Sequence, residues 1–508
     1  LEYNITYKEA FPDENLRRGV VLCIMRNKCG DVEYNSGSYE YDYYIKNLNG
    51  NNLFNLIGDY YETLFYTSRY GDILTNEDIL KKEQEKISKE DLEKIRVLIP
   101  QYKENVVTRL DGIEYLKNLK VISLVYLEQE NLDFSNNKEL KYLNIRGVNL
   151  NSMNLSQNLK LNRLIASLSR NDKNLDLSHL TELRVLEMQN SGIKDIKLPN
   201  GITKVQLRDN RISDIILPNT VSYLNLHSNK LTSIILPASI EEVEISSNEI
   251  ENIVFNGNNL RSLSAMGNAI KNIVLPEGLG SAQLGRNKIE TITLPSTLNN
   301  LNLDDNKISN ITLPDNISQV SIERNQISKI DLKNKRNLTY LDLVGNSLED
   351  IDVSDSPNLR TVKFGIKKTK DTIDFSNNTE LTNVQIYTTE EGKINSLDFS
   401  KQANLSQLFL ENLGLTNLNI ERNSDLGDLY LKNNNLENLD LSKNTRLYSL
   451  RLFNNNIKNF KTPSNLTAYT VEVEETRKLK VKKNSYVTIP DMIYNDQKFY
   501  LEDNSNYE

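Results

Sequence analysis

A repeat of about 19 residues runs through residues 191–346 and constrains the fold more than any other feature of the chain. Two apolar positions, two residues apart, recur in each repeat, as at Leu224 and Leu226. Three residues after the second apolar position comes an asparagine: Asn210, Asn229, Asn248, Asn268, Asn287, Asn306, Asn325 and Asn346. A fixed period near 20 residues indicates a solenoid in which each repeat is one turn.

This spacing has a physical explanation. Side chains of a strand alternate between its two faces, so the two apolar positions point into the core and their neighbours point outward. An asparagine after the strand satisfies backbone groups of the neighbouring turn that burial would leave unpaired. Nineteen residues leave no room for a full helix, and a Leu-Pro step such as Leu236-Pro237 favours extended backbone. We therefore predict a parallel concave sheet with an asparagine ladder, opposite a convex side that is mostly extended or 3-10.

Longer repeats of about 21 residues flank the central block. In the C-terminal ones the step Leu-Asp-x-Ser, as at Leu439-Asp440-Leu441-Ser442, marks each repeat, and its aspartate is typical of a turn. The asparagine ladder resumes at Asn434 and Asn455. We expect an array of about 17 repeats over residues 113–463. The pattern LxxLxLxxN resembles the leucine-rich repeat, which implies an α/β solenoid shaped as a horseshoe.

Residues 1–112 indicate a helical cap, since the apolar end of a solenoid must be covered. Pro12-Asp13 is predicted to begin a helix that Gly30 ends. Thr75-x-x-Asp78 and Ser88-x-x-Asp91 are similar to capping boxes, each beginning a short helix. A tyrosine-rich insertion, residues 31–71, interrupts the cap. It is either an ordered insertion packed on the cap or a recognition loop.

Two further features lie near the ends of the chain. Cys23 and Cys29 are the only cysteines, and six residues apart on a helix they would lie on different faces, which predicts two buried thiols. From residue 464 the repeat is lost, and alternating apolar residues at 470–475, 479–481 and 486–489 predict strands. Residues 464–508 are therefore a C-terminal β cap or the start of a truncated β domain.

Three segments carry a closer family resemblance: residues 11–16 (FPDENL), 89–92 (KEDL) and 107–119 (VTRLDGIEYLKNL). Together with the array they resemble the N-terminal cap and first repeat of internalin-like proteins of Gram-positive bacteria. The tyrosine-rich insertion departs from that pattern. The resemblance implies a secreted or wall-attached protein that binds another protein, of a host or of a bacterial surface, through its concave face.

Composition and motifs argue against several classes of protein. The formal net charge of −8 argues against a nucleic-acid partner. The chain has no run of 18 apolar residues, which argues against a transmembrane helix. Residues 1–20 do not form a signal peptide. His179 and His227 are the only histidines, and no zinc-binding, phosphate-binding or serine-hydrolase motif is present. We expect no catalytic residue, no metal site and no cofactor.

The outward strand positions of the predicted sheet change character along the array. In the middle they are small or acidic, which indicates a solvated surface: Ser262, Ser264, Ser281, Asn302, Asp304, Asp305 and Glu323. Toward the C-terminal end they are aromatic with charged neighbours: Tyr340, Tyr387, Phe409, Tyr430 and Phe453, flanked by Glu411, Asp428, Lys432 and Arg451. A smaller set marks the N-terminal end: Tyr126, Tyr142 and Arg146.

Exposed aromatic residues with charged neighbours have the composition of a protein-binding hot spot. Ring stacking that only stabilises the sheet is the alternative interpretation. Phe409 and Tyr430 share one register in consecutive repeats, so their rings should lie about 5 Å apart.

We therefore expect a non-enzymatic, monomeric binding module at the cell surface or outside the cell. Two alternatives stay open. The array could be the targeting arm of a secreted effector enzyme, since its Leu-Pro steps resemble those of effector ubiquitin-ligase repeats. It could also be a self-associating surface-layer protein.

Overall fold

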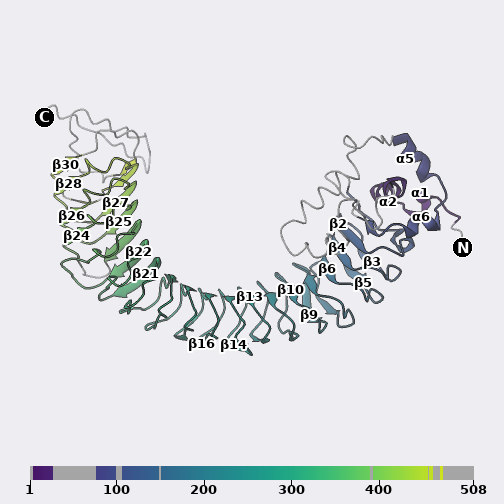
Figure 1. The fold of residues 1–508 in the computed structure, drawn as a ribbon, viewed down its shortest axis with the longest axis horizontal. Coiled ribbons are helices and arrows are strands. Elements are labelled where there is room, and N and C mark those ends of the chain that lie inside the picture. The colour runs from purple at the N-terminus through teal and green to yellow at the C-terminus, as the bar shows by residue number, and fades with distance from the viewer. Residues whose placement is uncertain are drawn as a thin grey trace, which may run out of the picture. The chain divides into compact units, whose positions relative to one another are not determined.

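The computed structural model describes residues 4–26, 76–98, 106–147, 150–388, 393–452, 454–455, 457–461 and 470–472. The chain forms two compact units, Leu1–Gly257 and Asn258–Glu508. Each unit is a stack of turns with a parallel main sheet on one side and short strands on the opposite side (Figure 1). Leucine, isoleucine and valine side chains fill the space between the main sheet and the short strands of each unit.

The helices of the first unit that the structure describes precede its repeats: α1 (Tyr7–Ala10), α2 (Glu14–Arg26), α5 (Asn76–Glu83) and α6 (Lys89–Glu93). Asp13 Oδ1 accepts hydrogen bonds from two backbone N–H groups at the start of α2, at 2.9 and 3.1 Å. Ser88 Oγ accepts one from Asp91 N at 3.3 Å in α6. Two of the three predicted helix starts, those at Asp13 and Ser88, are confirmed. Helix α1, which begins with a capping box of Thr6 and Glu9, was not predicted from the sequence.

The prediction of two buried thiols is wrong. Cys23 is 5% exposed and is disulfide-bonded. The prediction placed both cysteines on one helix, whereas α2 ends at Arg26. Cys29, Gly30, Thr75 and the tyrosine-rich insertion lie outside the described residues.

Among its described residues, the first unit contains one parallel main sheet and three short strand pairs. The main sheet runs in the order β1 (Val97–Leu98), β2 (Val121–Leu127), β4 (Tyr142–Gly147), β6 (Arg163–Ser167), β8 (Val185–Glu187), β10 (Lys204–Gln206), β11 (Tyr223–Asn225) and β13 (Glu242–Glu244). The opposite side carries the pairs β3 (Asn131–Asp133) with β5 (Ser152–Asn154), β7 (Lys173–Asp176) with β9 (Ile193–Lys197), and β12 (Ser233–Leu236) with β14 (Asn252–Phe255). The 3-10 turn η2 (Ile113–Tyr115) precedes β2.

The second unit repeats this arrangement. Its main sheet runs in the order β15 (Ser262–Ser264), β17 (Ser281–Gln283), β19 (Asn300–Asn302), β20 (Gln319–Ser321), β21 (Tyr340–Leu348), β22 (Thr361–Ile366), β23 (Asn383–Thr388), β25 (Gln407–Glu411), β27 (Asp428–Lys432), β29 (Ser449–Arg451) and β31 (Thr470–Glu472). The opposite side carries β16 (Asn272–Val274) with β18 (Thr291–Thr293), β24 (Ser396–Asp398) with β26 (Asn417–Asn419), and β28 (Asn438–Asp440) with β30 (Asn459–Lys461). The predicted extended opposite side is confirmed in both units.

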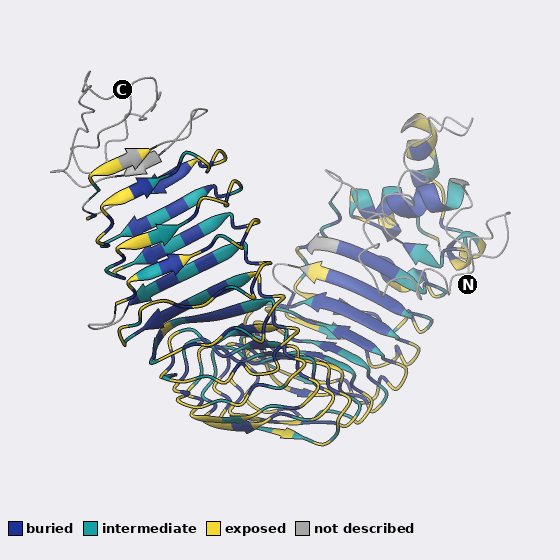
Figure 2. Ribbon diagram, turned by 60° about the vertical axis from the view of Figure 1, so that its left-hand side comes forward, coloured by how far each residue is buried: buried dark blue, intermediate teal, exposed yellow. Residues whose placement is uncertain are grey.

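Burial alternates along the main-sheet strands, as the period-2 pattern predicts. In β25 and β27 the leucines are buried and the residues between them are half-buried (Figure 2). Leu143, Ile145 and Leu164 of the longer repeats are fully buried. The inward positions read from the sequence are therefore those of the core.

The asparagines after the main-sheet strands bond to backbone groups of adjacent turns. Asn229 Nδ2 donates to the carbonyl oxygens of Leu207 and Leu226, both at 3.0 Å, and its Oδ1 accepts from Ile212 N at 3.0 Å. Every one of the ten predicted ladder asparagines donates from Nδ2 to at least one backbone carbonyl. In one of the longer repeats Ser191 occupies the position of the ladder asparagine, and its Oγ accepts a hydrogen bond from Leu168 N at 3.0 Å. Eight of the ten asparagines are buried, and bonds such as those of Asn229 to Leu207 and Ile212 join one turn to the next.

A second amide ladder, which was not predicted from the sequence, lies beside the opposite-side strands of the longer repeats. Its members are Asn137 and Asn158 in the first unit and Asn378, Gln402, Asn423 and Asn444 in the second, all buried. Asn444 Nδ2, for example, donates to the carbonyl oxygens of Ile420 and Asn423 at 3.0 and 2.9 Å. The sequence does contain a signal for this ladder, because Asn444 comes two residues after the serine of a Leu-Asp-x-Ser step.

The aspartates of the Leu-Asp-x-Ser steps form turns, as predicted. Asp352, Asp398 and Asp440 accept hydrogen bonds from the backbone N–H of the serine two residues on, at 3.0, 2.9 and 3.0 Å. Burial raises the pKa of Asp440, but hydrogen bonds from Lys461 and Ser442 outweigh it and lower the pKa to about 2. Hydrogen bonds from Ser178 lower the pKa of Asp176 to about 2 as well.

These lowered pKa values predict a loss of stability in acid. A carboxyl whose folded pKa lies below its unfolded value, about 3.9, contributes stability that is present above that value and is lost as the pH falls toward 2. We expect the urea midpoint of unfolding to fall between about pH 5 and pH 2. The double variant Asp176→Asn with Asp440→Asn should lose less over that range. Parallel pH profiles of the variant and the wild type would contradict this assignment.

Candidate partner-binding face

The open face, defined as the side chains of the main sheet that point away from the core, holds most of the predicted site residues. Phe409, Tyr430 and Arg451 lie directly opposite one another on β25, β27 and β29. Two residues along each strand, a second row contains Tyr387, Glu411 and Lys432. The remaining members are Asp428, opposite Gln407 on β25, Tyr340, on β21, and Phe453, which lies outside the described residues.

Phe409 and Tyr430 form the centre of this group. Their ring centroids are 6.1 Å apart and the ring planes are tilted by 35°. Both side chains are half-buried on the open face. Burial, followed by the nearby Glu411 carboxylate, raises the pKa of Tyr430. The pair therefore offers a partly exposed aromatic surface whose rings are already ordered.

Two ion pairs flank the aromatic pair. Lys432 Nζ lies 2.9 Å from Glu411 Oε1 on the neighbouring strand, and this hydrogen bond raises the pKa of the lysine. Arg451 Nη1 lies 3.8 Å from Asp428 Oδ1. We call Phe409, Tyr430 and these four charged residues the aromatic patch. The patch combines an apolar centre with a polar rim of balanced charge.

Tyr387 has a local bond that limits its freedom. Its ring covers Gly365 of β22, where an added Cβ would come within 2.6 Å of the ring carbon Cζ. Its hydroxyl accepts a hydrogen bond from the backbone N–H of Gly345, one strand further on. Burial raises the pKa of Tyr387. The repeat pattern predicts only the face of the sheet on which Tyr387 lies, so the sequence could not show its contacts with Gly365 and Gly345.

Tyr340 is likewise engaged by its neighbours. Its hydroxyl lies 3.1 Å from the carboxylate of Asp342, which is fully buried. Lys363 Nζ pairs with the same carboxylate at 2.9 Å and lies over the Tyr340 ring, 5.5 Å from its centroid. The hydroxyls of Tyr340 and Tyr387 are therefore both bonded within the sheet.

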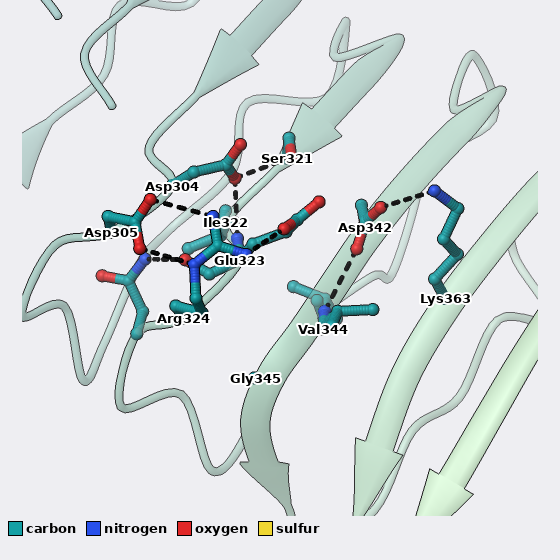
Figure 3. A network of polar contacts seen from close by, with 12 residues as sticks. Asp304, Asp305, Ser321, Ile322, Glu323, Arg324, Asp342, Val344, Gly345 and Lys363 are labelled. Carbon is teal, nitrogen blue, oxygen red and sulfur yellow. Dashed lines mark hydrogen bonds and ion pairs between the residues drawn. The ribbon is translucent and has the colours of Figure 1, made fainter. Parts of the chain in front are cut away.

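The acidic residues expected on a solvated surface are bonded between turns (Figure 3). Asp304 Oδ1 accepts from Ser321 Oγ and from the backbone N of Glu323, both at 2.7 Å. Arg324 Nη2 and Nη1 bond to Asp305 and Glu323 at 2.8 and 2.6 Å. Burial, followed by the nearby Asp342 and Asp304, raises the pKa of Glu323. This region therefore contributes to the cohesion of the stack.

The N-terminal set of open-face residues differs from the expectation. Tyr142 is only 1% exposed, so it is buried although its strand position points away from the core. It packs against Ile165 and Val121 of the adjacent strands. Arg146 is exposed, and the side chain of Tyr126 lies outside the described residues.

The described residues offer few groups suited to catalysis or metal binding. No group of three or more His, Cys, Asp or Glu side chains is arranged to hold a metal ion in the described part of the chain. His179 Nε2 lies 3.3 Å from the carbonyl oxygen of Leu155, and His227 Nδ1 lies 3.6 Å from Glu244. Within the same described residues, no helix is long and apolar enough to cross a membrane.

Comparison with known proteins identifies the fold. No family model matches the chain, and no curated protein matches it. Among solved structures, YopM from Yersinia enterocolitica WA-314 is 18% identical, with a TM-score of 0.56 over 82% of this chain and 100% of that one. The leucine-rich repeat protein LIC12759 of Leptospira interrogans is 19% identical, with a TM-score of 0.50 over 69% and 88%.

A third similar structure is the plant peptide hormone receptor RGFR1 in complex with RGF2, 17% identical, with a TM-score of 0.50 over 72% of each chain. At these identities the likeness shows the fold alone. The chain has the leucine-rich repeat fold, as the sequence pattern predicted.

Proposed function

We propose that this protein is a non-enzymatic, internalin-like module that binds another protein through the aromatic patch on its open face. The observation that carries the proposal is the ordered pair of Phe409 and Tyr430 between two ion pairs. Aromatic anchors inside a polar rim have the composition of interface hot spots. The site lies within the array that we assign to residues 113–463.

The arrangement favours binding because its parts are ordered before a partner arrives. Phe409 and Tyr430 lie on paired strands, so a partner does not have to order the backbone beneath them. The RGFR1 structure, a peptide hormone receptor in complex with RGF2, shares the fold and supports a role in binding a protein ligand.

The disulfide at Cys23 supports a location outside the cytoplasm. Disulfides form and persist in oxidising compartments, such as the outside of the cell, and are rare in the cytosol. We therefore propose that the module works at a cell surface or after secretion, where it meets proteins of a host or of a neighbouring cell.

The proposal predicts a binding defect in the double variant Phe409→Ala with Tyr430→Ala. Loss of two central aromatic anchors typically costs at least about 2 kcal/mol, so we expect binding at least about 30-fold weaker. The intact chain would first serve as bait for surface-protein extracts. The dissociation constant of the purified partner would then be measured by surface plasmon resonance.

The matched control is Tyr223→Ala, which removes a half-buried open-face tyrosine of β11 outside the patch. It should leave the affinity unchanged. Wild-type affinity in the double variant, with an unchanged thermal unfolding curve, would refute the assignment of the patch.

A further inference from the structure

The opposite side of the first unit contains a break between two neighbouring turns. In the described residues, β5 pairs only with β3 and β7 pairs only with β9. On the main-sheet side of the same turns, β4, β6 and β8 pair without interruption. The two turns are therefore not joined by strand hydrogen bonds on this side, and a slot lies between residues 151–155 and 173–177, which contain β5 and β7.

The slot contains a pocket of about 210 Å³ that is partly open to solvent and lined mostly by apolar side chains. Its walls are leucine and methionine side chains, among them the buried Leu164, Leu168, Leu177 and Met188. Its polar lining includes Lys173 and Asn174 from β7. An apolar cavity of about 150 Å³ stays dry and admits benzene, so this one is large enough for a small apolar group.

Hydrogen bonds join the two turns on both sides of the slot. Before β5, Ser169 N donates to the carbonyl oxygen of Leu150, and Ser169 Oγ bonds to Asn151 Oδ1, both at 2.6 Å. After β5, His179 Nε2 lies 3.3 Å from the carbonyl oxygen of Leu155. These bonds keep the turns together at the ends, so the slot excludes an additional strand and suits a small molecule.

Lys173 lies at this slot, and in the described part of the chain no carboxylate is hydrogen-bonded to its ammonium group, although the charge of the neighbouring Asp172 acts on it. Lys173 Nζ bonds only to neutral acceptors, the carbonyl and hydroxyl oxygens of Ser169 at 2.6 and 2.8 Å and the carbonyl oxygen of Asn171 at 3.1 Å. The adjacent Asp172 pairs instead with Arg211. Burial lowers the pKa of Lys173. These three neutral acceptors use the three N–H donors of the ammonium group, so an incoming carboxylate would replace one of them. The exchange is favoured because a charged acceptor makes the stronger hydrogen bond.

We propose that this slot binds a small amphiphilic carboxylate, with its apolar tail in the leucine-lined cavity and its carboxylate on Lys173 Nζ. Scaled from the benzene-sized cavity, the volume fits a ligand of about eight non-hydrogen atoms. The site lies in the first unit and is independent of the aromatic patch, which belongs to the second. Hexanoate matches the required size and chemistry and serves as the probe.

The binding test uses the methionine methyl groups as reporters. Met153 and Met188 line the cavity, whereas Met266 follows β15 in the second unit. In the full chain labelled with methyl-¹³C methionine, hexanoate should shift the Met153 and Met188 signals saturably and leave Met266 unchanged. Acetate, which has the head group without the tail, should shift none of them. The absence of a saturable shift with hexanoate in the folded wild-type chain overturns the proposal.

Two variants separate the roles of charge and cavity. Lys173→Gln removes the ammonium group and should weaken hexanoate about tenfold, since a charged hydrogen bond contributes about 1.5 kcal/mol or more. The same variant should bind hexan-1-ol as the wild type does. Leu168→Phe fills the cavity and should abolish both. Equal hexanoate affinity in Lys173→Gln and the wild type overturns the carboxylate assignment, and wild-type binding in a folded Leu168→Phe chain overturns the cavity assignment.

Discussion

Replacing Asn306 by alanine is expected to lower the stability of the array by about 3 kcal/mol, because one side chain satisfies several buried backbone groups. Asn306 Nδ2 donates to the carbonyl oxygens of Leu284 and Leu303, both at 3.0 Å. Its Oδ1 accepts from the backbone N–H of Ile289 at 2.8 Å. Alanine would leave the Ile289 N–H buried without a partner, which costs about 1–3 kcal/mol. It would also remove one of the two amide bonds at each carbonyl, since Leu284 keeps Asn287 and Leu303 keeps Asn325, at a further cost of about 0.5–1.5 kcal/mol for each lost bond.

The control for this prediction lies in the same turn. Asn300 is half-buried on the open face, and its amide bonds only to other side chains, those of Gln283 and Gln319, both at 3.2 Å. Asn300→Ala should therefore change stability by no more than about 0.5 kcal/mol. Urea unfolding followed by circular dichroism measures both variants. Equal losses in Asn300→Ala and Asn306→Ala would show that the ladder position has no special role.

The sequence alone predicted much of the array, because its main determinant is periodic. Leu226 and Leu303 recur at the phase that points inward, and both are fully buried. The register of Phe409 opposite Tyr430 also followed from the repeat length. Because side chains alternate along each strand and the turns have equal lengths, the buried positions and the rows of the open face could both be predicted from the sequence.

What the sequence did not predict depends on contacts that do not repeat. Tyr142 occupies an outward position yet is buried, since its neighbours Val121 and Ile165 on the adjacent strands pack against it. The second amide ladder was missed because its members vary in type, as Gln402 and Asn423 show. The break between β5 and β7 escaped prediction because it arises where strands of adjacent turns fail to pair.

The contact between Tyr387 and Gly365 is also one that does not repeat, because the tyrosine ring covers the glycine of the neighbouring strand. Gly365→Ala is expected to destabilise the wild-type protein by about 2 kcal/mol, in the range typical of overpacking. The new methyl group would lie 2.6 Å from Tyr387 Cζ and displace the ring, together with its bond to Gly345 N. In a Tyr387→Ala background the methyl group meets no ring. There the same change should be neutral or slightly stabilising, since glycine within a strand is less favourable than alanine by about 0.5–1 kcal/mol.

The double-mutant cycle of Gly365→Ala and Tyr387→Ala measures this coupling directly. We expect the two changes to deviate from additivity by about 2 kcal/mol, within the range found for residues in contact. Additive losses would mean that the ring does not lie over Gly365. The cycle also bears on function, because a tyrosine whose ring is held against its own sheet is not available as an anchor. Tyr387→Ala should then impair stability more than partner binding, while the Phe409→Ala with Tyr430→Ala variant should show the reverse.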